Sequence, residues 1–107
     1  MRNSMDYIYL SGDQKILIEV EQKNTRQFVI EQYVQCRKTQ GITQAELARR
    51  TGIPRSNITR FESGNYNPSL ELLVRIAAAL GMSLQMRLTE KPPEEVEAIL
   101  SGKELQT

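Results

Sequence analysis

The chain has 107 residues, which is enough for one domain with terminal arms. One cysteine and no histidine exclude an intrachain disulfide, a histidine-based catalytic triad and a histidine zinc site. The net charge is only +1, but residues 25–65 carry +4 between flanks of −1 and −2, a weak indication of nucleic-acid binding for which an ordinary solvated surface is the alternative.

Residues 1–24 form an N-terminal arm for which the sequence predicts a β-hairpin. Residues 7–10 are short, aromatic and β-prone, and residues 11–14 have the composition of a turn. Apolar side chains with a period of two follow the turn, at Ile16, Ile18 and Val20. Leu17 interrupts this alternation.

The sequence predicts four helices over residues 25–81. The first is expected over 26–40, because apolar side chains recur at helical spacing, and Gly41 can end it. One side of this helix carries Val29, Tyr33 and Cys36. The fourth helix is expected over 70–80, where the same spacing recurs after the expected cap Ser69.

The second and third helices are short and are expected to be joined by a tight turn. The second is predicted over 43–51, because Thr43 and Glu46 have the spacing of a capping box. The third is predicted over 54–63, because Pro54 suits the first position of a helix, where its missing N–H costs nothing.

After the fourth helix the period of the apolar residues changes to two. Residues 82–90 are therefore predicted to form a short, half-buried strand. Its apolar side carries Met82, Leu84, Met86 and Leu88. Two prolines then end the pattern, and residues 91–107 are predicted to be a polar C-terminal tail.

The second and third helices have the features that a helix-turn-helix requires. Ala48 is a small residue where the helices would cross closely, and Gly52 can adopt the positive φ that the turn needs. The apolar residues that would hold both helices to the core are Leu47, Ile53, Ile58 and Phe61. Each feature alone means little, but the joint pattern is specific.

Residues 26–81 resemble a helix-turn-helix domain of the Xre/Cro phage-repressor family. The resemblance is carried by Thr43-Gln44-Ala45-Glu46-Leu47-Ala48, Gly52-Ile53, Ser56-Asn57-Ile58, Phe61-Glu62-Ser63-Gly64, Asn67-Pro68-Ser69 and Leu80-Gly81. It implies a mainly α fold, a bundle of four or five helices, here flanked by the N-terminal β-hairpin and the short C-terminal strand. It also implies binding of double-stranded operator DNA as a homodimer.

Within this resemblance, the helix over 54–63 is the recognition helix, and four outward positions are expected to contact bases in the major groove. These positions are Arg55, Ser56, Thr59 and Arg60. Arginine can donate two hydrogen bonds to O6 and N7 of guanine, and serine or threonine can contact bases or phosphates. The alternative is that the two arginines only form the solvent-exposed side of an amphipathic helix.

Phosphate contacts are expected at the start of the second helix and in the loop after the third. The residues are Thr43, Gln44, Ser63, Asn65 and Asn67. Helix capping and turn formation are the alternative roles of such side chains. Many relatives carry lysine or arginine in this loop, so we expect fewer released counterions and a shallower salt dependence here.

Two charged residues are expected to have a structural role. The resemblance implies a semi-buried salt bridge between Arg37 and Glu62, which anchors the recognition helix. Arg37 lies on the side of Tyr33 and Cys36, too near the core to remain unpaired. Cys36 itself is expected to be a small core residue.

The predicted strand over 82–88 needs a partner strand. It is expected to pair with the same strand of a second chain, as in Xre-like antitoxins, or with residues 7–20 of its own chain, or with both. A homodimer would match a palindromic operator with half-sites ~34 Å apart.

Three functions fit the sequence: a DNA-binding repressor, an antitoxin that also represses its own operon, and a helix-turn-helix interaction module without DNA binding. The tail from Lys91 is either a toxin-binding segment or a solvated terminus. An enzyme, a metal, a small-molecule cofactor and a membrane partner are not expected. The chain has no apolar run of ~20 residues and no signal-peptide pattern, which predicts a cytoplasmic protein.

Overall fold

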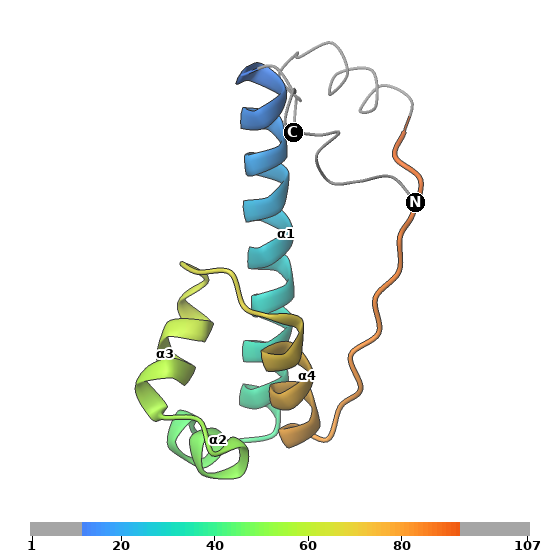
Figure 1. Ribbon diagram of the computed structural model, residues 1–107. Coiled ribbons are helices and arrows are strands. Elements are labelled where there is room, and N and C mark those ends of the chain that lie inside the picture. Colours follow the sequence, from blue (N-terminus) through green and yellow to red (C-terminus); the bar gives the residue numbers. More distant parts are fainter. Residues whose placement is uncertain (1–11, 93–107) are drawn as a thin grey trace. The chain divides into compact units, whose positions relative to one another are not determined.

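The computed structural model describes residues 12–92 (Figure 1). This part of the chain contains four helices and no strand: α1 (Gly12–Thr39), α2 (Gln44–Thr51), α3 (Arg55–Ser63) and α4 (Leu70–Ala79). The chain divides into two compact units, Thr25–Arg87 and the combination of Met1–Asn24 with Leu88–Thr107. The predicted motif lies in the unit Thr25–Arg87. None of the helices in the described range has the length and apolar character needed to cross a membrane.

The predicted N-terminal β-hairpin is wrong where the structure describes it, because residues 12–24 are the first turns of α1. No glycine or proline occurs between Asp13 and Gln40, so nothing local interrupts the helix before its end. The β preference of isoleucine and valine depends on their surroundings and does not override this continuity. Leu17 is buried, whereas the residues of the alternating pattern are exposed: Ile16, Ile18 and Val20. The expected strand over 7–10 lies outside the described residues.

The predicted strand over residues 82–90 is also wrong, because these residues form neither helix nor strand. A strand exists through hydrogen bonds to a neighbour, and the expected hairpin partner is helical where it is described. Of the four apolar residues with a period of two, Leu84 packs partly against the core. The other three are exposed: Met82, Met86 and Leu88. Within the described residues, this segment therefore does not pair with residues 12–20 of its own chain.

The helix starts differ in how their free N–H groups are satisfied. The hydroxyl of Thr43 accepts a hydrogen bond from the N–H of Glu46 at 3.0 Å, and the hydroxyl of Ser69 accepts one from the N–H of Leu72 at 3.0 Å. Pro54 precedes the first residue of α3 as its N-cap and supplies no side-chain acceptor. The start of α3 therefore depends on the turn before it and on packing.

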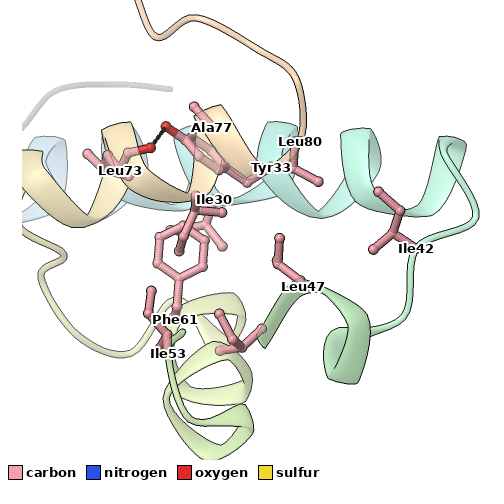
Figure 2. Packing of buried hydrophobic residues seen from close by; sticks show 11 residues of the cluster. Ile30, Tyr33, Ile42, Leu47, Ile53, Phe61, Leu73, Ala77 and Leu80 are labelled. Carbon is pink, nitrogen blue, oxygen red and sulfur yellow. Dashed lines mark hydrogen bonds between the residues drawn. The ribbon is translucent and has the colours of Figure 1, made fainter. Parts of the chain in front are cut away.

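All four helices contribute to one apolar core (Figure 2). Its buried residues are Ile30, Tyr33, Ile42, Leu47, Ile53, Ile58, Phe61, Leu73, Ile76, Ala77 and Leu80. The rings of Tyr33 and Phe61 meet edge to face, with centroids 5.4 Å apart. The Tyr33 hydroxyl donates to the carbonyl oxygen of Leu73 at 2.8 Å, which joins α1 to α4, and burial raises the pKa of this phenol.

The core predicts a large difference between two leucine substitutions. Leu47→Ala removes a side chain from a residue that is 1% exposed, so we expect the free energy of unfolding to fall by about 2–5 kcal/mol. The matched control Leu70→Ala acts on a residue that is 57% exposed and should change it by no more than about 0.5 kcal/mol. Urea denaturation followed by circular dichroism measures both values. Equal losses would contradict the core as described.

Candidate nucleic-acid interface

The turn between α2 and α3 is held by its own hydrogen bonds. Gly52 has a φ of +73°, which residues with a side chain rarely adopt, and its N–H donates to the carbonyl oxygen of Ala48 at 2.9 Å. The Thr51 hydroxyl donates to the carbonyl oxygen of Leu47 at 2.8 Å and accepts from the N–H of Ile53 at 3.2 Å. These bonds fix the direction in which the chain enters α3.

α3 has one buried side and one exposed side. Ile58 and Phe61 are 0% and 1% exposed and hold the helix against the core. The four residues predicted to contact bases are all exposed on the other side: Arg55, Ser56, Thr59 and Arg60. The first turn of α3 contains no acidic residue, so no carboxylate there competes with an anion for the helix N-terminus.

The side chain of Gln44, at the start of α2, bridges to α3. Its amide oxygen accepts a hydrogen bond from the Thr59 hydroxyl at 2.9 Å, and its amide nitrogen donates to a carboxylate oxygen of Glu62 at 3.0 Å. The Thr59 hydroxyl also lies 3.1 Å from the carbonyl oxygen of Arg55. Two residues expected to contact DNA, Gln44 and Thr59, therefore also hold α2 and α3 together.

A bidentate ion pair joins α1 to the end of α3. Nε of Arg37 donates to one oxygen of Glu62 at 2.6 Å, and Nη2 donates to the other at 2.8 Å. The two side chains are only 10% and 8% exposed. The remaining Nη1 of Arg37 donates to the carbonyl oxygen of Ile42 at 2.7 Å. The pair lies where the family resemblance implies it, and its geometry restricts rotation of α3.

Arg26 of α1 holds the loop that follows α3. Its Nε donates to the carbonyl oxygen of Gly64 at 3.0 Å, and its guanidinium also binds the side-chain oxygen of Asn67. Arg26 was not predicted as part of the site, because these partners are 38 and 41 residues away and no local pattern marks the contact. Asn67, which was expected to contact a phosphate, is therefore also a partner of α1.

The same loop carries an aromatic ring beneath an exposed arginine. The guanidinium carbon of Arg60 lies 4.7 Å from the centroid of the Tyr66 ring, within the range of a cation–π contact. The Ser63 hydroxyl donates to the carbonyl oxygen of Arg60 at 2.6 Å and accepts from the N–H of Asn65 at 3.3 Å. Tyr66 was not predicted as part of the site, although its aromatic side chain in an otherwise polar loop was a signal that could have indicated it.

Glu46 binds two arginines of α2 and does not complete the predicted capping box. Its carboxylate accepts hydrogen bonds from Nε of Arg49 at 2.9 Å and from Nε of Arg50 at 3.1 Å. These bonds lower the pKa of Glu46 from 4.5 to about 2.

Unlike Arg49 and Arg50, the exposed arginines of α3, Arg55 and Arg60, take part in no ion pair within residues 12–92.

The family model described as Helix-turn-helix matches residues 35–86. An uncharacterized HTH-type transcriptional regulator of Haemophilus influenzae is 34% identical over 68 residues, which are 64% of this chain and 69% of the relative. The chain belongs to the Xre/Cro-like helix-turn-helix family. Another such regulator, from Methanothermobacter thermautotrophicus, is 56% identical over 45 residues, which are 42% of this chain and 65% of that relative, slightly under two thirds of its length.

This Xre/Cro-like chain is also similar to a phage protein and to a solved structure. The immunity repressor protein of Bacillus phage phi105 is 36% identical over 55 residues, which are 51% of this chain and 38% of the repressor. A chain of a structure titled a toxin–antitoxin module from Streptococcus pneumoniae matches with a TM-score of 0.54, over 83% of this chain and 96% of the other. At 23% sequence identity, this likeness concerns the fold alone.

The buried ion pair predicts a strong effect of removing one partner. Glu62→Ala leaves the Arg37 guanidinium buried without its carboxylate, so we expect a loss of about 3–5 kcal/mol in the free energy of unfolding. The matched control is Glu71→Ala, which breaks the exposed Arg75–Glu71 pair and should cost less than about 1 kcal/mol. Urea unfolding measures both variants. A small loss for Glu62→Ala would show that the pair does not anchor α3.

The Glu46 carboxyl predicts a local pH dependence. Because its pKa is lower in the folded chain than in the unfolded chain, its contribution to stability is fully present above about pH 4.5 and is lost as the pH falls toward 2. NMR titration of the carboxyl carbon should give a pKa near 2. The Arg49→Ala/Arg50→Ala variant should return this pKa toward 4.5. An unchanged pKa in that variant would exclude the two arginines as its cause.

Proposed function

We propose that this Xre/Cro-like chain is a sequence-specific DNA-binding transcriptional regulator that acts as a repressor. The observation that carries the proposal is the exposed side of α3, where Arg55 and Arg60 have no ion-pair partner in the described part of the chain. The opposite side of this helix is fixed in the core by Ile58 and Phe61. Relatives named as transcriptional regulators and as a phage immunity repressor support the same function.

In this function, α3 enters the major groove of operator DNA with its N-terminal residues toward the base edges. Arg55 and Ser56 belong to that first turn, and Arg60 follows on the same exposed side. Each arginine can donate two hydrogen bonds to a guanine, which contributes about 1–3 kcal/mol of discrimination. The Thr59 hydroxyl lies between the two arginines and can still accept a hydrogen bond from a base or from water.

Phosphate contacts come from the elements on either side of α3. Thr43 and Gln44 lie at the N-terminus of α2, where free N–H groups and the helix dipole favour an anion. The loop after α3 supplies polar groups at Ser63, Asn65 and Asn67. None of these residues is cationic, so few phosphates are neutralised and the dependence of affinity on salt is shallow.

The functional form on an operator is a homodimer. One helix-turn-helix contacts one half-site of a few base pairs, and a two-fold pair of chains doubles the contact with a palindromic sequence. The two recognition helices would then lie ~34 Å apart, one helical turn of DNA.

An antitoxin would use the same DNA-contacting surface and add a surface for its toxin. The Streptococcus pneumoniae neighbour supports this alternative through its fold alone. A helix-turn-helix module without DNA binding would not require exposed, unpaired arginines on α3. The regulator is therefore the function that the described surface supports best.

The proposal predicts selective binding that depends on α3. In fluorescence anisotropy at two salt concentrations, the chain should prefer a duplex with its own promoter region over a scrambled duplex. Arg55→Ala/Arg60→Ala should lower this preference by at least about tenfold, because the two arginine–guanine contacts that it removes each contribute about 1–3 kcal/mol. Two chains per duplex support the homodimer, and one chain per duplex would overturn it.

The matched control is Arg75→Ala, which removes a positive charge from α4 where Arg75 is paired with Glu71. It should leave the preference unchanged. Wild-type binding that is equal on both duplexes and vanishes equally on both as salt rises would overturn specific recognition. The interaction-module function would then take its place.

A further inference from the structure

The contact between Arg60 and Tyr66 restrains an arginine without using its donors. The guanidinium carbon lies 4.7 Å from the ring centroid, and a cation–π contact of this kind is made with the ring face. It consumes none of the five N–H groups of arginine. Among the described residues, no hydrogen bond or ion pair uses those groups either. The contact therefore restrains Arg60, while the N–H groups of its guanidinium remain available to bind another group.

The Tyr66 ring is itself fixed in position. Its residue is partly buried and packs against the apolar core. The loop around it is bound on both sides, because Arg26 donates to the carbonyl oxygen of Gly64 and to the side chain of Asn67. A chain of contacts thus runs from α1 through the loop to the Tyr66 ring and on to Arg60, on the exposed side of α3.

Arg55 provides a comparison on the same helix. It is exposed like Arg60, but no aromatic contact in residues 12–92 restrains it. Arginine has many rotamers to lose when it binds in one orientation, and a side chain that is already oriented loses fewer. The ring therefore lowers the entropic cost of a contact made by Arg60 and leaves a contact made by Arg55 unaffected.

We infer that Tyr66 is a positioning residue for sequence recognition, which holds Arg60 in the orientation that contacts a guanine. Tyr66 contributes to selectivity through Arg60 and touches no base itself. This inference rests on the proposed DNA-binding function, and it adds a residue of the loop to those that determine specificity.

The test uses the full chain and a duplex that the wild-type chain selects from a random pool. Single-base variants of this duplex identify the guanine whose preference is lost in Arg60→Ala. At that position Tyr66→Leu should lower the preference by about 2- to 5-fold, equivalent to about 0.5–1 kcal/mol for an exposed cation–π contact. Tyr66→Phe keeps the ring face and should retain the preference. Preference at the position assigned by Arg55→Ala should stay unchanged in both.

A purely structural role of the ring is separated by a double-mutant cycle. In an Arg60→Ala background, Tyr66→Leu should cause no further loss, because the residue it positions is absent. Thermal unfolding of each variant shows that the chain is folded at the assay temperature. Equal losses with and without Arg60, or full preference in a folded Tyr66→Leu variant, would overturn the inference alone. A wild-type chain without any sequence preference would overturn the proposed function and the inference together.

Discussion

The buried ion pair between Arg37 and Glu62 determines where α3 can lie. With side chains only 10% and 8% exposed, neither charge has water as a substitute partner, so the two elements that carry them must stay together. Glu62 also accepts a hydrogen bond from Gln44, which in turn binds Thr59. One carboxylate at the end of α3 therefore sets the position of α3 against both α1 and α2.

Most of the positively charged side chains in residues 25–65 bind other groups of the fold. Arg37 is paired with Glu62, Arg49 and Arg50 share Glu46, and Arg26 binds the loop after α3. Arg55 and Arg60 are different, because they lie exposed on one side of α3 without an ion pair in the described range. The net charge of a segment is thus a poor measure of its electrostatic surface, which depends on how many charges the fold itself neutralises.

The helix-turn-helix could be predicted from the sequence because its signals are local. Thr43 and Ser69 each cap the first turn of the helix that follows them, and Gly52 forms the turn after α2. The predictions of the hairpin and the strand were wrong, because a strand needs a partner strand, and an alternating apolar pattern does not show that such a partner exists. Distance along the chain also hid Arg26, whose partners lie 38 and 41 residues away. The Arg37–Glu62 pair was accessible only through the family resemblance, since 25 residues separate its members.

α2 and α3 contain only 8 and 9 residues, and helices shorter than about 12–15 residues are marginal in water by themselves. The surface proposed to contact DNA therefore exists only while the surrounding core is folded. Operator DNA that binds the folded chain alone must also stabilise it, by an amount that grows with the concentration of free DNA sites relative to Kd. If the chain is a repressor, a genetic screen for lost repression would consequently recover substitutions in the core as well as substitutions of base-contacting residues. An operator that binds with a lower Kd would stabilise the folded chain more and would hide the core substitutions that destabilise it least.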